Sequence, residues 1–272
     1  MERINVLGKG FVGGRFVDMT PNVSVNQRND YTVKPGTKEV VYFISTIDNY
    51  NVHSDPFLDI NTNLITLIKT LESCKDKDIT FNFISSWFVY GDVPLPARED
   101  AHCDPKGFYS ITKRAAEQLL ISYCETFDIN YRIIRLANVL GITDNKVSKK
   151  KNALQYMINE IKEGRDVNLY NNGEIYRDYI HVDDVVKAIN LIIESGNKND
   201  IYNVGNGEKV YLIDVLSKVK EMTNSSSKLI GIEPAPFHTK VQTKNMVLNI
   251  NKIKELGYIP DFTMTEILES LL

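Results

Sequence analysis

Apolar residues along the chain follow two different spacings. Short, almost continuous apolar runs, typical of strands buried on both faces of a sheet, occur at residues 4–7, 23–25, 40–44 and 79–84. Longer segments repeat their apolar residues at helical spacing, as in Phe57, Ile60, Leu64, Ile68 and Leu71. Because strands and helices alternate, the pattern predicts an α/β fold with a doubly wound parallel sheet.

Composition narrows the classes of partner. The chain has 272 residues, 43% of them hydrophobic and 25% charged, which suits one large domain or a large domain with a smaller lobe. A net charge of -3 gives no basic excess of the kind that nucleic-acid-binding proteins carry. No apolar run approaches the roughly 18 residues of a membrane span, and we expect no signal peptide before the first strand. The expected partner is a small molecule, with no nucleic acid and no membrane.

The cysteines and histidines predict neither disulfides nor a metal site. Cys74, Cys103 and Cys124 are odd in number and far apart. Such usage is typical of a reduced compartment, so we expect a cytoplasmic protein. The four histidines do not stand at ligand spacing from other acids, histidines or cysteines, and no metal is expected.

A glycine-rich turn follows the first strand. Gly8, Gly10 and Gly13 form a G-x-G-x-x-G pattern that encloses Phe11 and Val12. Glycines let the backbone approach a pyrophosphate, and free N–H groups at the start of the following helix bind it. The order of strand, glycine turn and helix predicts a Rossmann-type dinucleotide site at these five residues.

Residues at the ends of the next two strands are candidates for contacts with the dinucleotide. Arg28 stands about 20 residues after the first glycine, where such folds contact the adenosine ribose. An arginine there suits the 2′-phosphate of NADP, whereas Asp30 would take the 2′-hydroxyl of NAD if the loop folds back. Both cofactors stay open, with a small preference for NADP. Ser45 ends the third strand and is expected to line the cofactor crevice.

The candidate chemistry lies at the start of a helix-patterned run. Tyr109 and Lys113 are four residues apart, so their side chains share one face of a helix. An ammonium beside a phenol favours the phenolate and lowers its pKa toward neutral pH, which suits acid–base catalysis. Ser86 follows the strand at 79–84 and could bond the same substrate oxygen, or could instead only make a hydrogen bond at the strand end. The alternative for the pair is a packed aromatic ring under a lysine.

Further motifs follow in a fixed order. The series comprises Gly8-x-Gly10-x-x-Gly13, Ser85-Ser86 before Val89-Tyr90-Gly91, Tyr109-x-x-x-Lys113, and the segments 135–141, 177–184 and 202–205. With these motifs the chain resembles the extended short-chain dehydrogenase/reductases, in particular their nucleotide-sugar epimerase/dehydratase branch. The resemblance implies an NAD(P)-dependent enzyme that acts on a nucleoside-diphosphate sugar.

The resemblance also implies roles for individual residues. Tyr109 would be the acid–base residue and Ser86 the hydroxyl that orients the sugar oxygen. Lys113 would lower the pKa of Tyr109 and bind the nicotinamide ribose. Asn138 would lie at the substrate pocket, and Arg177 would face the nucleotide diphosphate.

Two residues depart from the family pattern. Family dehydratases carry an Asp-Glu pair directly after the position of Ser86, where this chain has Trp87 and Phe88. Dehydration is therefore disfavoured, as are decarboxylation, which uses the glutamate, and combined epimerisation and reduction, which uses a cysteine in place of Trp87. Trp87 is expected to contact the substrate instead.

Two reactions remain compatible with the motifs. One is epimerisation by hydride transfer at C4 of a nucleoside-diphosphate hexose, and the alternative is reduction of a nucleoside-diphosphate 4-keto-6-deoxy sugar. A non-catalytic NAD(P)-sensing protein is less favoured, because a sensor needs no set such as Ser86, Tyr109 and Lys113. The nucleotide, the sugar and a homodimer are left open.

The rest of the chain predicts a lobe and a shortened first half. The strand and helix that relatives carry between residues 25 and 40 are expected to be missing. We assign 1–141 and 173–200 to the dinucleotide-binding domain and 142–172 and 201–272 to a discontinuous substrate-binding lobe, with 178–182 returning to the main sheet. The lysines at 149–151 would either start a solvated helix or guide an anionic substrate. Lys240 would replace a family arginine at the phosphates.

Overall fold

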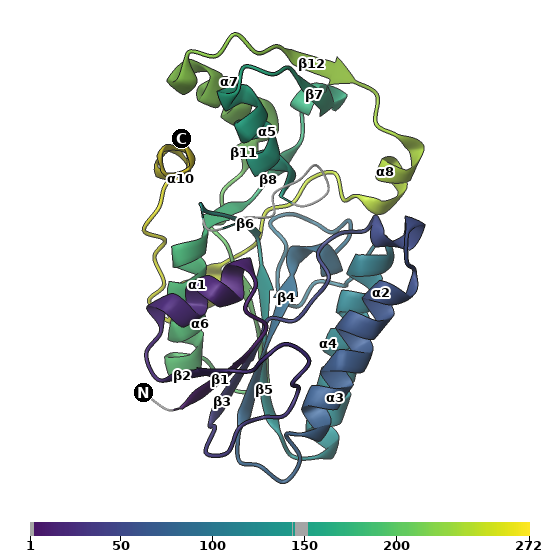
Figure 1. Ribbon diagram of the computed structural model, residues 1–272, viewed down its shortest axis with the longest axis vertical. Coiled ribbons are helices and arrows are strands. Elements are labelled where there is room, and N and C mark those ends of the chain that lie inside the picture. The colour runs from purple at the N-terminus through teal and green to yellow at the C-terminus, as the bar shows by residue number, and fades with distance from the viewer. Residues whose placement is uncertain (1–2, 143, 145–151) are drawn as a thin grey trace.

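The centre of the molecule is a parallel sheet (Figure 1). The computed structural model describes residues 3–142, 144 and 152–272. Six strands pair parallel in the order β10-β5-β4-β3-β1-β2. Their bounds are β1 (Ile4–Leu7), β2 (Val23–Val25), β3 (Glu39–Tyr42), β4 (Thr80–Ser86), β5 (Asn130–Leu136) and β10 (Asp200–Val204). The predicted α/β class and doubly wound sheet are confirmed.

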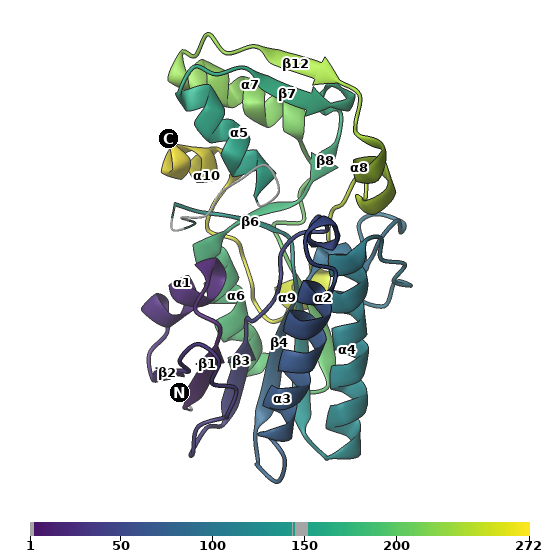
Figure 2. The ribbon, with the colours of Figure 1, turned by 45° about the vertical axis from the view of Figure 1, so that its right-hand side comes forward.

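Helices cover both faces of this sheet, which explains why its strands are apolar on both sides. One face carries α1 and α6, and the other carries α2, α3 and α4 (Figures 1 and 2). Their bounds are α1 (Phe11–Met19), α2 (Phe57–Asp59), α3 (Thr66–Glu72), α4 (Phe108–Thr126) and α6 (Val182–Ser195). A π-helical turn, Ile60–Ile65, joins α2 to α3. Each face has its own apolar core, one around Phe16 and Ile189 and the other around Leu67 and Leu120.

The strand order reverses beside β1. The chain places β2 on one side of β1 and β3 on the other, and in such sheets ligands bind at the carboxyl ends of the strands where the order reverses. Residues 26–38, all of them described, connect β2 with β3 without a helix or strand. This is the shortening that the sequence predicts.

Small sheets and helices form a lobe at the carboxyl edge of the main sheet (Figures 1 and 2). The paired strands are β6 (Asn138–Leu140) with β9 (Tyr179–His181), β8 (Tyr176–Arg177) with β11 (Val210–Tyr211), and β7 (Val167–Tyr170) with β12 (Leu229–Ile232). A third apolar core lies among α5 (Ala153–Lys162), α7 (Leu212–Thr223) and α10 (Met264–Leu271). Two further helices are α8 (Pro236–Val241) and α9 (Asn251–Glu255).

One prediction for this region is wrong. Residues 178–182 do not return to the main sheet, because β9 pairs with β6 and the place beside β5 is taken by β10. Since β10 belongs to the main sheet, the proposed domain boundary after residue 200 passes through its first residues. The domain division stays a proposal, and the lysines at 149–151 lie outside the described residues.

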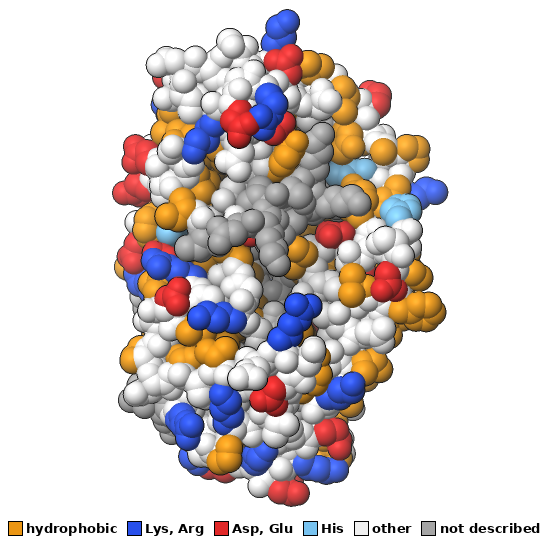
Figure 3. Space-filling model, in the orientation of Figure 1, with side chains coloured by type: hydrophobic (Ala, Val, Ile, Leu, Met, Phe, Trp, Pro, Cys, Tyr) orange, Lys and Arg blue, Asp and Glu red, His pale blue; other side chains and the backbone are white. Residues whose placement is uncertain are grey.

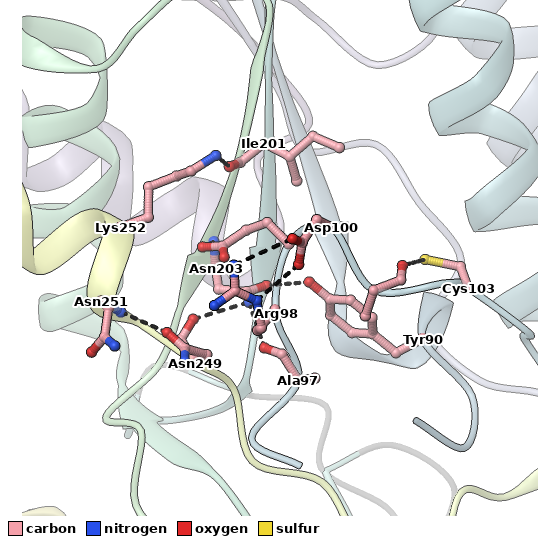
Figure 4. Close-up of polar contacts among 12 residues, drawn as sticks. Tyr90, Ala97, Arg98, Asp100, Cys103, Ile201, Asn203, Asn249, Asn251 and Lys252 are labelled. Carbon is pink, nitrogen blue, oxygen red and sulfur yellow. Dashed lines mark hydrogen bonds and ion pairs between the residues drawn. The ribbon is translucent and has the colours of Figure 1, made fainter. Parts of the chain in front are cut away.

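The segment that leads into α4 is tied to the edge of the main sheet (Figure 4). The Tyr90 hydroxyl donates to Oδ1 of Asn203 in β10 at 2.7 Å. The Asn203 amide donates in turn to the carbonyl oxygens of Ala97 at 2.9 Å and Asn249 at 3.0 Å. These bonds hold the chain between β4 and α4 against β10.

The surface combines scattered charge with an exposed apolar face. Lys and Arg side chains stand among acidic, apolar and neutral ones on the face drawn in Figure 3. Over α2 to α4, apolar side chains reach solvent: Phe57 is 66% exposed, Ile65 47%, Ile111 50% and Leu119 41%. Across the described ranges, no helix has the length and apolar character needed to cross a membrane.

Candidate active site

Helix α4 presents Tyr109 and Lys113 on one face. The helix begins at Phe108, directly after Gly107, whose φ of 84° lies in a region that favours glycine. Both side chains are buried, Tyr109 with 7% and Lys113 with 2% of its surface exposed. The Lys113 Nζ lies 4.2 Å from the centroid of the Phe83 ring in β4. The expected pair therefore lies between α4 and the sheet rather than in solvent.

Two serines affect the pKa of the Tyr109 hydroxyl. Ser86 ends β4, and Ser45 follows β3, so both stand at the carboxyl edge of the sheet. Burial raises the pKa of the Tyr109 phenol, and hydrogen bonds with Ser86 and Ser45 offset part of this increase. The charge of Asp59 raises it further. Side chains from distant parts of the sequence thus act on the same phenol.

The structure revises the electrostatic part of the sequence-based interpretation. That interpretation has Lys113 lower the pKa of Tyr109, but the pKa of Tyr109 is raised, because burial outweighs the other effects. Burial also lowers the pKa of Lys113 to about 7, against an opposing effect of the Glu117 charge. Lys113 therefore stands near the midpoint of its titration at neutral pH.

A buried amide that the sequence analysis did not single out connects these parts. Asn63, in the π-helical turn, accepts hydrogen bonds from Ser45 Oγ at 3.2 Å and Thr46 N at 2.9 Å. It donates to Thr46 Oγ1 at 2.8 Å and to Thr112 Oγ1 at 2.9 Å. All four bonds of the amide are made, and they join the Ser45 loop to α4. The sequence signal is only a polar residue within an apolar helical run, and π-helical turns are frequent at functional sites.

The glycine turn fits a dinucleotide. Gly8 has a φ of +98°, and a Cβ there would lie 2.9 Å from a backbone nitrogen of the loop after β3. At Gly10 nothing described lies within 4 Å of a Cβ position, so the backbone is open on that side. Helix α1 starts at Phe11, which Val12 follows, and no side chain caps its N-terminus. The backbone N–H groups of this first turn are therefore available to bind a pyrophosphate. Gly13 packs against the Gly8 carbonyl, where a Cβ would be only 2.1 Å away.

The loop after β2 holds the residues expected at the ribose. Arg28 and Asp30 are both exposed. The Asp30 carboxylate accepts the N–H of Thr32 at 3.0 Å, and the Asn26 amide donates to the carbonyl oxygens of Asp30 and Thr32 at 3.0 and 2.9 Å. These bonds fold the loop back on itself while Arg28 extends into solvent. The arrangement leaves NAD and NADP open.

Arg177 lies on the lobe side of the site. It is 9% exposed, and its guanidinium carbon lies 5.1 Å from the centroid of the Trp87 ring. It donates to the carbonyl oxygens of Tyr176, Thr243 and Lys244. Within the described ranges no carboxylate pairs with it. Burial lowers its pKa to about 10, so the group still carries a positive charge at neutral pH.

The residues between Arg177 and Tyr109 form an apolar wall. The rings of Trp87 and Phe88 stack with their centroids 3.9 Å apart, and Phe88 meets Tyr109 edge-on at 5.9 Å. Asn138 stands at the start of β6 and donates from its amide to the Asp178 carbonyl at 3.0 Å. The wall supplies neither an acid nor a base where dehydratases of the resembled family carry both.

Comparison with known proteins decides the family. A model of the NAD-dependent epimerase/dehydratase family matches residues 22–205, which is more than half of the chain. The chain belongs to this family. The matched range contains Ser86, Tyr109, Lys113 and Arg177, whereas the glycine turn precedes it. The resemblance drawn from the motifs is therefore confirmed, and the chain is an NAD(P)-dependent enzyme of the nucleotide-sugar type.

Similar proteins in this family carry out different reactions. The ADP-L-glycero-D-manno-heptose-6-epimerase of Brachyspira hyodysenteriae is 28% identical over 71% of this chain, which spans 61% of that protein. The dTDP-4-dehydro-6-deoxyglucose reductase of Escherichia coli is 22% identical over 95% of this chain and 81% of its own. Among solved structures, the UDP-glucose 4-epimerase of Thermotoga maritima with UDP-glucose has a TM-score of 0.86 at 23% identity, covering 99% of this chain and 97% of that one. The last likeness supports the fold of this family member.

The remaining residues singled out in the sequence lie outside the Tyr109 cluster. His181 accepts the N–H of Asp183 at the start of α6 at 3.3 Å and stacks on Phe262 at 3.9 Å, so its contacts are structural. Lys240 is exposed on α8. In the part of the chain that the structure describes, no group of three His, Cys, Asp or Glu could hold a metal ion.

Proposed function

We propose that this family member epimerises a nucleoside-diphosphate hexose by hydride transfer at C4. The observation that carries the proposal is the convergence of Ser86, Ser45 and Tyr109 beside buried Lys113 at the open edge of the sheet. Bound NAD or NADP supplies the hydride transfer. The protein supplies the proton transfer and the positioning of the sugar.

Tyr109 is the proton carrier in this proposal. In its phenolate form Tyr109 would take the proton of the C4 hydroxyl as the hydride leaves C4, becoming the phenol, and would return that proton to the C4 oxygen when the hydride comes back. Ser86, whose hydroxyl lowers the pKa of Tyr109, would orient the same oxygen. Lys113, one helical turn after Tyr109, would stabilise the phenolate in its protonated form and bind the nicotinamide ribose.

Separate residues hold the two ligands. The N–H groups at Gly10, Phe11 and Val12 bind the pyrophosphate of the cofactor, and the bare backbone at Gly8 and Gly13 allows the close approach. Arg28 contacts the ribose end, with NADP slightly preferred, and Ser45 lines the crevice.

On the substrate side, Arg177 faces the diphosphate, because its charge has no carboxylate among the described residues. Trp87 forms the wall beside the sugar, and Asn138 borders the pocket. The absence of an acid–base pair at Trp87 and Phe88 supports a reaction without water elimination.

Reduction of a nucleoside-diphosphate 4-keto-6-deoxy sugar is the alternative. It is favoured by the short loop 26–38, which leaves Arg28 exposed and suggests that a cofactor could exchange after each turnover. The similarity to a dTDP-4-dehydro-6-deoxyglucose reductase points the same way. A reductase consumes one reduced cofactor per product, whereas an epimerase recycles its cofactor.

One experiment separates the two reactions. The purified protein is incubated with UDP-, dTDP-, GDP- and CDP-hexoses and with their 4-keto-6-deoxy forms, while the absorbance of reduced nicotinamide and the sugar stereochemistry by NMR are followed. Inversion at C4 without net change of cofactor is expected. Stoichiometric loss of NADH or NADPH with a keto sugar would establish the reductase instead, and no turnover of any sugar would refute both.

We also propose a cytoplasmic homodimer. The exposed apolar side chains Phe57, Ile65, Ile111 and Leu119 lie on neighbouring helices, and a second copy related by a two-fold axis would cover them. Light scattering of the protein and of Ile111→Asp tests this surface. A dimer that the substitution converts to a monomer is expected, and a monomeric wild type would contradict the proposal.

A further inference from the structure

A buried charge cluster lies under the candidate active site. Glu117, in α4, is completely buried, and Arg135, in β5, is 1% exposed. The guanidinium of Arg135 donates to both carboxylate oxygens of Glu117, at 3.1 and 2.8 Å. Arg114 adds a bond at 2.7 Å, and the Ser85 hydroxyl donates one at 2.5 Å. The carboxylate is thus fully engaged by α4, β4 and β5.

The cluster adjoins both candidate catalytic elements. Glu117 follows Lys113 by four residues, so Tyr109, Lys113 and Glu117 occupy successive turns on one face of α4. Its partner Ser85 is the neighbour of Ser86 in β4. The carboxylate therefore contacts the strand end that carries the orienting serine and stands one turn below the lysine.

The other side of the cluster is anchored to the sheet edge. Arg135 donates to the Glu99 carbonyl at 3.2 Å, and its guanidinium lies 4.7 Å from the centroid of the Tyr90 ring. Tyr90 is the residue whose hydroxyl is bonded to Asn203 in Figure 4. The position of Glu117 is consequently fixed from two directions.

Stability alone gives a weak reason for such a cluster. Removing two charges from water costs several kcal/mol per ion, and buried ion pairs replaced by apolar residues of similar volume often leave proteins as stable or more so. Since this buried pair is bonded to Ser85 and lies one helical turn from Lys113, we look for its role in the chemistry of the site.

We infer that Glu117 is a positioning residue that favours the protonated form of Lys113 and holds the end of β4, and with it Ser86, in place. The inference rests on the proposed function, in which Lys113 acts as a cation beneath Tyr109. Burial lowers the pKa of Lys113 to about 7, and the Glu117 carboxylate opposes this decrease. Without that charge, Lys113 would lose its proton at lower pH.

The charges around Lys113 come from three elements. On α4 itself they are Glu117 and Arg114, whose side chain is 26% exposed. From β5 comes Arg135, bonded to Glu117, whereas β4 presents the uncharged ring of Phe83. Asp59, from α2, faces Tyr109 and affects the pKa of that phenol. Among these groups Glu117 is the one that raises the pKa of Lys113.

The titration of Lys113 provides a test that needs no substrate. The full chain is labelled with ¹³C-lysine, the Lys113 signal is assigned by its loss in Lys113→Met, and its chemical shift is followed against pH. Glu117→Gln leaves Arg135 buried without a carboxylate, so the main variant is Glu117→Gln with Arg135→Gln, which removes both charges. We expect the midpoint of Lys113 to fall by less than about one pKa unit, the scale of a nearby opposite charge, because loss of the Arg135 cation offsets part of the effect of losing the carboxylate.

Activity gives the second readout. In the double variant, the pH at which kcat declines on the alkaline side should move down with the Lys113 midpoint. Glu117→Asp keeps the charge on a shorter side chain, so it should restore most of the midpoint while kcat stays reduced, because the bond to Ser85 is lengthened. Glu125→Gln, which removes an exposed carboxylate two turns farther along α4, serves as the matched control and should change neither quantity.

The outcomes separate the inference from the proposed function. If the double variant folds, an unchanged Lys113 midpoint would overturn the role of Glu117. If the double variant does not fold, Glu117→Asp decides, and the role is overturned when this variant changes neither the Lys113 midpoint nor kcat. A protein that turns over no nucleotide sugar while its Lys113 midpoint still depends on Glu117 would refute the proposed function and leave the electrostatic inference standing.

Discussion

The α4 side and the β8 side of the site each contain a buried arginine, and the two arginines differ in their hydrogen-bond partners. On the α4 side, Arg135 pairs with both oxygens of Glu117, and although burial opposes its charge, the charge and hydrogen bonds of Glu117 raise its pKa. On the β8 side, Arg177 bonds only carbonyl oxygens and stacks on Trp87 in the described structure, and burial lowers its pKa to about 10.

This difference assigns different tasks to the two regions. The charge of Arg135 is neutralised within the protein, so it stabilises the arrangement of α4 and β4 that holds Tyr109, Lys113 and Ser86. No carboxylate among the described residues neutralises the charge of Arg177, and a buried cation of this kind is best compensated by an anionic ligand. We therefore expect substitutions on the α4 side to affect turnover and stability, and substitutions on the β8 side to affect substrate binding.

The largest effect is expected at Tyr109. Tyr109→Phe removes the ionisable oxygen and keeps the ring that Phe88 packs against. General acid–base catalysis contributes about a hundred- to ten-thousand-fold, so kcat should fall by that factor. Steady-state kinetics measure it, and cofactor titration should show nearly unchanged affinity. A variant that kept more than about a tenth of the wild-type kcat would contradict the role of Tyr109.

Breaking the neutralised pair should cost stability. Arg135→Met leaves the Glu117 carboxylate buried without its main partner, which costs about 3 to 5 kcal/mol of unfolding free energy. Denaturant titration measures the loss. Arg98→Met removes the exposed ion pair with Asp100 and serves as the control, with an expected change of about 1 kcal/mol or less. Equal losses in the two variants would show that burial of the Arg135 pair has no special weight.

The comparison also shows what the sequence reveals and what it does not. The strands at residues 4–7 and 23–25 are found within the predicted bounds, because a short apolar run bordered by turn residues specifies its own ends. The strand at 179–181 was recognised, but its partner was not, since the pattern of a strand says nothing of which edge is free. The bounds of a strand are therefore easier to predict from the sequence than the strand with which it pairs.

The residues of the candidate site also fall into two groups, those that the sequence indicates and those that it does not. Tyr109, Lys113 and Ser86 can be singled out as candidates from their spacing and their positions at strand and helix ends, together with the other motifs. Asn63 was missed, because its role depends on the π-helical turn and on contacts with segments distant in sequence. The direction of the Tyr109 pKa shift was also missed, since burial, which outweighs the hydrogen bonds, is a property of the packed structure.

On the β8 side, Arg177→Met should weaken substrate binding more than stability. The substitution removes a buried cation and leaves no buried carboxylate behind in the described structure, so the change in unfolding free energy should be smaller than for Arg135→Met. Loss of one partner of a buried charge pair with the diphosphate costs about 2 to 5 kcal/mol of binding free energy. Calorimetric titration with a nucleoside diphosphate measures it.

Arg177→Lys is the matched control on this side. It keeps a positive charge but loses the planar fork that bonds two oxygens at once, so its affinity should be intermediate. If Arg177→Met bound the nucleoside diphosphate as well as wild type, the uncompensated charge would serve another purpose and the division between the two sides would fail.

The smallest effect is expected at Arg28, on the cofactor side of the crevice. Arg28 is exposed, so its contact with a 2′-phosphate would be partly screened by solvent. Arg28→Ala should weaken NADP binding by about 1 to 3 kcal/mol, the scale of a charge-assisted contact, and leave NAD binding little changed, because NAD carries a hydroxyl in place of the phosphate. Fluorescence titration of both cofactors measures the difference, with Asp30→Ala as the control that should weaken only NAD if Asp30 takes the ribose hydroxyl. Equal losses for the two cofactors in Arg28→Ala would show that Arg28 does not distinguish them, and Asp30 would then be the residue to examine for selectivity.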